Sequence, residues 1–269
     1  MIAIVGLGLM GGSLALSLRH ADPGLEVVGI DSDPPTLRKA VESGAVTVAS
    51  DDVALCAGAE IVFLAVPVHA MRALLPQLPR TALVSDLGST KAEVCSWAAA
   101  AGVDFIGGHP MCGSEESGFD AAGADLFKGA AWVLTRPEPR LEKIVRSVGA
   151  HALFIDPAEH DRLVAGISHT AFVLSAAYLL AVTGSPDWKS MRPLAASGFR
   201  DMTRLAGGNS EMYAAIAATN SENIVSWLTA IEASLAKIRR HLAAGDPRVA
   251  ELFEDAHEAR LRWLTEEPA

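Results

Sequence analysis

Cysteine is scarce in this sequence of 269 residues, and its three copies argue against a structural metal site. Cys56, Cys95 and Cys112 show no C-x-x-C spacing and cannot all pair with one another. Structural zinc sites use closely spaced ligand pairs, and disulfide frameworks use even numbers of cysteines. We therefore expect a cytoplasmic protein, kept in a reducing compartment, with no metal site.

Clusters of basic residues are also missing. The sequence has 22 Lys and Arg against 32 Asp and Glu, a net charge of -10, and no basic run longer than Arg239-Arg240. Because neutralising phosphates requires a basic face, we expect no nucleic-acid partner. Half of the residues are hydrophobic and 20% are charged, which is typical of a globular protein with a substantial core.

Two stretches lack Asp, Glu, Lys and Arg altogether, residues 1–18 and 163–186. The first has no basic segment before its apolar run and contains four glycines, so it favours a strand and a turn over a signal peptide. The second is long enough to span a bilayer, but polar side chains interrupt it. We expect a helix buried in a protein or dimer core, and no membrane partner.

The first uncharged stretch indicates a nucleotide-binding turn. An apolar strand over residues 1–5 leads directly into Gly6-Leu7-Gly8-Leu9-Met10-Gly11, and residues 12–18 continue as a helix. This order lets backbone N–H groups at a helix N-terminus receive a pyrophosphate. We expect the cofactor to contact seven residues of this turn and of a later strand end: Gly6, Gly8, Leu9, Met10, Gly11, Val66 and Pro67.

Asp31 follows the second predicted strand, residues 25–30, and lies 20 residues after Gly11. A carboxylate at this position can bind the ribose hydroxyls of NAD and would repel the 2′-phosphate of NADP. Residues 32–34 supply no arginine to bind that phosphate. Asp31 could instead cap the helix from about Pro35. With the glycine pattern in register, the sequence favours NAD as the cofactor.

Strand and helix patterns alternate as far as about Pro157. Helices are expected at 70–75, 91–101 and 141–148, and further strands at 60–67, 82–86, 103–106, 132–135 and 152–155. This alternation predicts an α/β fold in which residues 1–157 form a Rossmann-type, doubly wound parallel sheet.

After Pro157 only helical patterns remain, at about 158–183, 188–206, 209–243 and 247–265. Residues 158–269 are therefore expected to form an all-helical C-terminal domain. This domain is too apolar to stand alone comfortably in water. We expect it to be a dimerisation domain that packs against a second copy in a homodimer.

His109 is the first candidate catalytic residue. It follows the predicted strand 103–106 in the run Gly107-Gly108-His109-Pro110, so we expect it on a turn at the carboxyl edge of the sheet. Open α/β sheets bind their ligands at that edge, and an imidazole titrates near neutrality. A lone histidine is nevertheless more often a turn or capping residue.

Ser89 is the second candidate, because it follows the strand 82–86 and lies on the same edge as His109. It could hydrogen-bond both a substrate hydroxyl and the imidazole of His109. Its alternative role is to cap the helix that begins near Lys91.

Polar residues of the helical domain gather in two places. Ser168 and His169 lie in the apolar helix, and the segment 198–204 carries Arg200 and Arg204. A buried histidine is more often a core residue, and the arginines could pair with Asp201. An arginine can, however, bind a substrate carboxylate through two parallel hydrogen bonds.

Together these motifs resemble the prephenate and arogenate dehydrogenase family. The resemblance spans essentially the whole chain, and its most specific part is the segment 107–118. It rests on G-L-G-L-M-G-G-S at the start, D-L-G-S-T-K at 86–91, G-G-H-P-M-C-G-S-E-E-S-G at 107–118, S-H at 168–169 and G-F-R-D-M-T-R at 198–204.

This resemblance implies an oxidoreductase of tyrosine biosynthesis that uses NAD. The reaction would be oxidative decarboxylation of prephenate to 4-hydroxyphenylpyruvate, of arogenate to tyrosine, or of both. His109 would be the general base, Ser89 its hydrogen-bonded partner at the ring hydroxyl, and Arg204 the ligand of the substrate carboxylate. The resemblance also places three further residues at the substrate, His169, Ser114 and Glu115.

One position departs from the family pattern and leaves the substrate open. Family members that use prephenate often have S-H-L-P-H, whereas this chain has S-H-T-A-F, with Phe172 in place of the second histidine. Because the sequence ends at Ala269, we expect no C-terminal regulatory domain, so any feedback by tyrosine would act at the active site.

Two other functions compete with this interpretation. A β-hydroxyacid dehydrogenase would carry a catalytic lysine on the first long helix after the nucleotide domain, and residues 163–188 contain none. A non-catalytic NAD-binding sensor would have no need of His109, Ser89 and Arg204.

Overall fold

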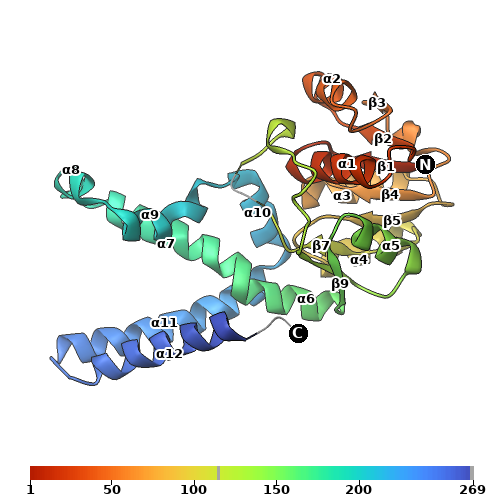
Figure 1. The fold of residues 1–269 in the computed structure, drawn as a ribbon. Coiled ribbons are helices and arrows are strands. Elements are labelled where there is room, and N and C mark those ends of the chain that lie inside the picture. The colour runs from red at the N-terminus through yellow and green to blue at the C-terminus, as the bar shows by residue number, and fades with distance from the viewer. Residues whose placement is uncertain (114–115, 267–269) are drawn as a thin grey trace. The chain divides into compact units, whose positions relative to one another are not determined.

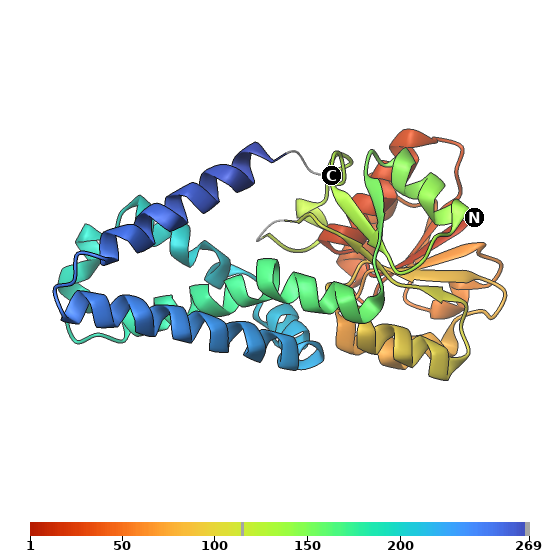
Figure 2. The ribbon, with the colours of Figure 1, turned by 90° about the horizontal axis from the view of Figure 1, so that it is seen from below.

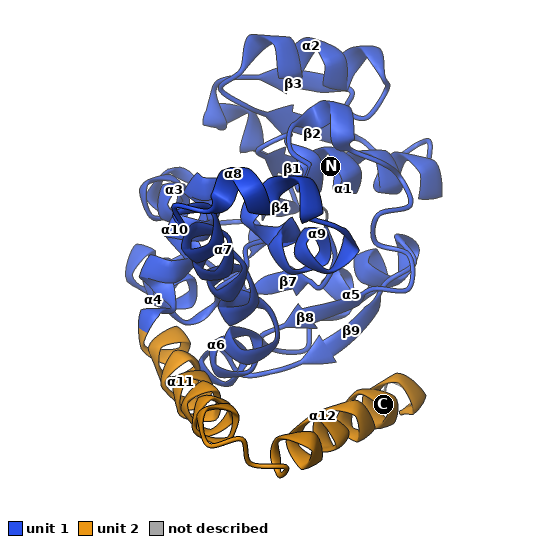
Figure 3. Ribbon diagram, turned by 90° about the vertical axis from the view of Figure 1, so that its left-hand side faces the viewer, with its two compact units in different colours: residues 1–221 blue, residues 222–269 orange. Residues whose placement is uncertain are grey.

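The fold is described from a computed structural model, in which residues 1–113 and 116–266 are placed. The chain divides into two compact units, Met1–Ser221 and Glu222–Ala269, shown in different colours in Figure 3. The predicted domain boundary at Pro157 describes a different division of the chain and stays a prediction.

A six-stranded parallel sheet forms the first part of unit 1 (Figure 1). Its strand order is β3-β2-β1-β4-β5-β6. The chain adds β2 and β3 on one side of β1 and then β4, β5 and β6 on the other, so the switch point lies between β1 and β4. Ligands of such sheets bind beyond the carboxyl ends of the strands at this switch point. The prediction of a Rossmann-type fold is confirmed. The strands are β1 (Ile2–Val5), β2 (Val27–Ile30), β3 (Val48–Ser50), β4 (Ile61–Leu64), β5 (Leu83–Asp86) and β6 (Phe105–Ile106).

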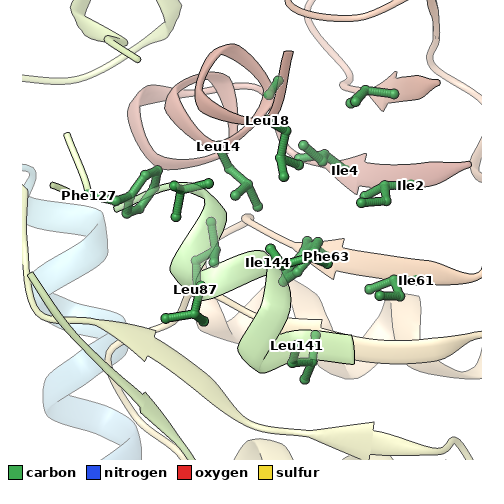
Figure 4. Packing of buried hydrophobic residues seen from close by; sticks show 14 of the residues in the cluster. Ile2, Ile4, Leu14, Leu18, Ile61, Phe63, Leu87, Phe127, Leu141 and Ile144 are labelled. Atoms are coloured by element: carbon green, nitrogen blue, oxygen red, sulfur yellow. The ribbon is translucent and has the colours of Figure 1, made fainter. Parts of the chain in front are cut away.

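Helices cover both faces of this sheet. Successive side chains of a strand point to opposite faces, and both sets are buried in the central strands, so each face needs a cover. Ile4 of β1 and Phe63 of β4 pack on the face covered by Leu14 of α1 (Figure 4). The neighbouring residues Val5 and Leu64 belong to the core on the opposite face. The helices are α1 (Leu9–Ala21), α2 (Pro34–Glu42), α3 (Val68–Leu74), α4 (Ala92–Ala101) and α5 (Pro139–Ser147).

A separate three-stranded sheet carries His109. It consists of β7 (Gly108–Pro110), β8 (Ala131–Leu134) and β9 (His151–Phe154), with β7 antiparallel to β8 and β8 parallel to β9. The expectation that the last two strands complete the parallel sheet is therefore wrong. His109 lies within strand β7, opposite Val133, rather than on a turn. The chain leaves the parallel sheet at Gly107, whose N–H donates to the Thr135 hydroxyl at 2.9 Å.

The helices after residue 157 are shorter than their patterns predict. The apolar stretch is α6 (Pro157–Val164), a π-helical turn (Ala165–His169) and α7 (Thr170–Thr183), which follow one another along a single rod in Figure 2. The predicted helix 209–243 is interrupted at Asn220, whose backbone leaves the helical region and whose side chain donates to the Asp161 carbonyl oxygen at 2.8 Å. The remaining helices are α8 (Trp188–Met191), α9 (Ser197–Thr203), α10 (Ser210–Thr219), α11 (Ser221–Ala243) and α12 (Val249–Thr265).

Within the described residues, the stretch 157–183 is long and apolar enough to cross a membrane by length and composition. Its most apolar window has a mean hydropathy of 1.7, and 33% of that window is buried in the protein. One such helix is weak evidence of a membrane span, because a core helix of a water-soluble protein passes the same test.

A buried ion pair joins the two sheets. The Lys91 ammonium donates to Asp86, and neither side chain is exposed to solvent. Asp86 also accepts the Gly108 N–H at 2.9 Å, while Lys91 donates to the Gly108 carbonyl oxygen at 2.6 Å. A Cβ atom at Gly108 would overlap the Asp86 carbonyl oxygen, so only glycine fits. The pair therefore binds both backbone polar groups of the residue before His109.

We expect Lys91→Met to lower the free energy of unfolding by about 3–5 kcal/mol, because it leaves the Asp86 carboxylate buried without its partner. The matched control is Lys39→Met, which breaks the pair of Lys39 with Asp120, whose side chains are 47% and 75% exposed. That change should cost less than about 1 kcal/mol. Urea unfolding followed by circular dichroism measures both, and equal losses would contradict a structural role for the buried pair.

Candidate active site

A cavity of about 680 Å³ opens at the switch point of the parallel sheet, entirely within unit 1. The glycine turn, the ends of β4 and β5, strand β7 and the helical segments after residue 166 all contribute to its walls. It brings together eight of the residues predicted for the site: Gly8, Leu9, Met10, Val66, Pro67, Ser89, His109 and Arg204. Ser114 and Glu115 lie outside the described residues.

The glycine turn has the shape that a dinucleotide requires. A Cβ atom at Gly8 would meet no atom within 4 Å, so the backbone there borders open space. Gly6 has a φ of +93°, and a Cβ at Gly11 would overlap the Gly6 carbonyl oxygen. Helix α1 begins here with no side-chain cap and no acidic residue in its first turn. Its N-terminus can therefore bind an anionic phosphate, which fits NAD.

Asp31 stabilises this turn by hydrogen bonds to the backbone. Its carboxylate accepts the Leu7 N–H at 2.7 Å and the Asp33 N–H at 3.0 Å. The alternative role as a helix cap is wrong, because Asp33 caps α2 by accepting the Thr36 N–H at 3.0 Å. Neither Asp31 nor Gly6 and Gly11 line the cavity, so they shape the turn from outside it.

His109 lines the cavity and is only 8% exposed. Its Nδ1 atom lies 2.8 Å from Nε2 of His160, and the two rings are nearly perpendicular, at 73°. Burial lowers the pKa of His109 well below its usual 6.5, and His160, Lys91 and His169 lower it further. The imidazole is therefore neutral at pH 7 and can accept a proton.

Ser89 also lines the cavity, but in the described part of the structure no hydrogen bond joins its side chain to His109. The side chain that contacts the His109 ring is His160 instead, through Nδ1 of His109. The alternative role of Ser89 as a helix cap is wrong as well. The backbone N–H groups of Lys91 and Ala92, at the start of α4, donate to the Asp161 carboxylate at 2.7 and 2.9 Å.

His160 and Asp161 are thus two site residues that the sequence interpretation missed. They lie in α6, 51 and 52 positions after His109, and are 0% and 2% exposed. Their only signal in the sequence is the adjacent pair of polar residues, His160-Asp161, just before a long apolar stretch. A helix pattern alone does not show that this pair reaches the strand that carries His109.

His169 does not line the cavity; it lies buried behind the wall that Ser168 forms. Its Nδ1 atom is 3.0 Å from Nδ2 of Asn220. Burial is the main cause that lowers the pKa of His169 to about 4. The residue is therefore a neutral interior histidine in this structure, and its predicted contact with substrate stays a prediction.

Arg204 and Phe172 line two neighbouring cavities. Arg204, directly after α9, lines the same cavity as His109. A second cavity of about 310 Å³ shares Ser89 with the first and is lined by Phe172 and Tyr213. These two rings are stacked with centroids 4.1 Å apart. The site thus offers a base, a cation and an apolar wall.

Comparisons with known proteins agree along the chain. The model of the prephenate dehydrogenase nucleotide-binding domain matches residues 14–151, and that of the prephenate dehydrogenase dimerization domain matches residues 156–255. A prephenate dehydrogenase of Lactococcus lactis subsp. cremoris (strain MG1363) is 34% identical, over 96% of this chain and 76% of that protein.

Two solved structures are similar over nearly the whole chain. Synechocystis arogenate dehydrogenase is 33% identical with a TM-score of 0.80, and the alignment covers 97% of this chain and 99% of that one. The prephenate dehydrogenase from A. aeolicus in complex with hydroxyphenyl propionate and NAD+ is 25% identical with a TM-score of 0.90, covering 97% of each chain.

The site makes a direct prediction about proton binding. Because burial penalises the imidazolium form, the ring signals of His109 should shift only when the pH falls well below 6.5, and those of His169 at about pH 4. Histidine NMR across an acid titration measures both midpoints. In urea, where the burial is lost, the same signals should titrate near pH 6.5, the value for an exposed histidine. A folded-state midpoint for His109 at or above 6.5 would contradict the neutral base.

Proposed function

The chain belongs to the prephenate dehydrogenase family, and we propose that it oxidises and decarboxylates prephenate, arogenate or both, with NAD, in tyrosine biosynthesis. One observation carries the proposal for this chain's own residues. A neutral, buried histidine, an arginine and the glycine turn of a dinucleotide fold line the same cavity.

The substrate is a cyclohexadienol with a ring carboxylate, and NAD when bound supplies the hydride acceptor. His109 takes the proton of the ring hydroxyl while the hydride leaves the hydroxyl-bearing carbon. Carbon dioxide departs from the ring carboxylate, and the ring becomes aromatic. The product is a phenol, so the proton held by His109 is returned and the base ends the cycle neutral.

The remaining residues position the substrate. Arg204 binds a substrate carboxylate by charge-assisted hydrogen bonds, and Ser89, which follows the carboxyl end of β5, contacts the ring hydroxyl. We also keep His169, Ser114 and Glu115 as proposed substrate residues. Gly8, Leu9, Met10, Val66 and Pro67 line the cavity, and they are the proposed cofactor contacts. Asp31 is the proposed ligand of the ribose hydroxyls.

We further propose that the enzyme is a cytoplasmic homodimer with no membrane or nucleic-acid partner. The match to a dimerization-domain model supports the dimer. Large apolar side chains of the helical segments are exposed in the single chain, among them Leu180 and Leu194, at 71% and 81%. Burial of such residues against a second copy would remove this surface from water.

The test is to supply prephenate and arogenate separately with NAD and to follow the absorbance of NADH. Wild-type protein should oxidise at least one of them. His109→Asn should lower kcat by about 100-fold or more, the usual effect of removing a general base, with little change in the affinity for NAD. His151→Phe, at an exposed position of β9, serves as the control. No NADH from either substrate would overturn the proposed function, and normal turnover by His109→Asn would remove His109 from it.

The stacked pair of Phe172 and Tyr213 predicts substrate preference. The two substrates differ in their side chain, a pyruvyl keto group in prephenate and an ammonium in arogenate. In Phe172→His an imidazole N–H could donate to the keto oxygen, and its cation would repel the ammonium. One such hydrogen bond is worth about 1 kcal/mol, so kcat/KM for prephenate relative to arogenate should rise by roughly fivefold. Phe172→Leu is the apolar control, and an unchanged ratio in both variants would place the side chain of the substrate elsewhere.

A further inference from the structure

His109 is one end of a buried set of hydrogen bonds that we call the histidine relay, formed by His109, His160 and Asp161. Nδ1 of His109 lies 2.8 Å from Nε2 of His160, and Nδ1 of His160 lies 2.8 Å from Oδ1 of Asp161. His160 and Asp161 are 0% and 2% exposed. The order of donors and acceptors along the relay therefore decides which nitrogen of His109 carries a proton.

Asp161 sets the direction of the relay because a carboxylate can only accept hydrogen bonds. Its two oxygens already accept the N–H groups of Lys91 and Ala92, which open helix α4. Lys91 makes no side-chain cap of its own at this helix start, so Asp161 caps α4 from another segment. The helix N-terminus favours the negative charge of the carboxylate. His160 must therefore donate to Asp161 from Nδ1.

An uncharged imidazole that carries its proton on Nδ1 has Nε2 as an acceptor. Nδ1 of His109 then has to be the donor in its contact with His160, and Nε2 of His109 keeps its lone pair. Because Nδ1 is turned toward His160, Nε2 is the nitrogen available to the cavity that His109 lines. We propose that His160 and Asp161 are positioning residues that hold His109 in the tautomer able to accept a proton from the substrate.

The same arrangement suits His109 after it has accepted a proton. An imidazolium donates from both nitrogens, so the bond from Nδ1 to His160 is kept and no side chain has to turn. Two other titratable groups stand near the relay, and both have partners elsewhere. Lys91 is bonded to Asp86 and Gly108, and His169 contacts Asn220. His160 is therefore the one described side chain bonded to the His109 ring.

The inference rests on the proposed function only for the source of the proton, so one of its readouts uses no substrate. Nitrogen NMR of the His109 ring in the free protein should show a proton on Nδ1 and none on Nε2. In His160→Phe, which keeps an aromatic ring but offers no acceptor, a proton should appear on Nε2. The kcat should fall by about 10- to 100-fold, less than on loss of the base, with the KM for NAD unchanged.

His160→Gln provides the rescue, because its amide oxygen can accept the Nδ1 proton of His109. It should keep the wild-type ring signals and most of the wild-type kcat. His151→Phe repeats the histidine-to-phenylalanine change at an exposed strand position and should alter neither readout. If His160→Phe does not fold, the nitrogen NMR spectra of the wild-type protein and of His160→Gln still show which nitrogen of His109 carries the proton.

Two results would overturn the relay. One is a wild-type His109 that carries its proton on Nε2. The other is a His160→Phe protein in which the ring of His109 keeps its wild-type protonation, whether or not kcat falls, since a fall in kcat alone indicates a structural role. If the wild-type protein shows no turnover but its His109 ring carries the proton on Nδ1, the result counts against the proposed function and leaves the relay intact.

Discussion

The buried pair of Asp86 and Lys91 is the interaction on which the site depends. Removing two charges from water is costly, and the cost is offset here because each partner also binds the backbone of Gly108. The pair thereby ties the end of β5 to the first residue of β7, although the two strands belong to different sheets. It also fixes the start of α4, where the Lys91 N–H meets Asp161. One lysine thus links the strand that carries the proposed base, His109, to the carboxylate of Asp161.

Local patterns were sufficient to predict the glycine turn and the fold around it. The glycine turn, the strand before it and Asp31 after the second strand are all defined by residues close in sequence, and their chemistry requires those residue types at that spacing. The structure corrected one detail, because Asp33 rather than Asp31 caps α2. The position of His109 could not be predicted in the same way. A short apolar strand pattern shows that a strand forms, but not which sheet it joins or in which direction.

The partners of His109 were beyond local reasoning for a related physical cause. His160 and Asp161 lie on a helix whose pattern looks ordinary, and only the packing of α6 against the start of α4 brings them to the base. One break in a predicted helix serves this packing. The break at Asn220 lets one amide contact both the Asp161 carbonyl and His169. Helix propensity cannot reveal such breaks, because the contacts that stabilise them come from distant segments.

Burial has two opposite effects on a catalytic histidine. It keeps the imidazole of His109 neutral at pH 7, but it also makes the ring a weaker base, because the imidazolium that forms on proton transfer is equally desolvated. A buried base is therefore useful only if the cation is stabilised at the moment it forms. His160 accepts a hydrogen bond from Nδ1 of His109 whether His109 is neutral or protonated. The Asp161 carboxylate is hydrogen-bonded to the other nitrogen of His160. The negative charge of Asp161 is itself supported by α4, so the stabilisation needs no movement when the proton arrives. The imidazole of His109 can then be unprotonated at neutral pH, while the imidazolium that forms on proton transfer is stabilised inside the protein.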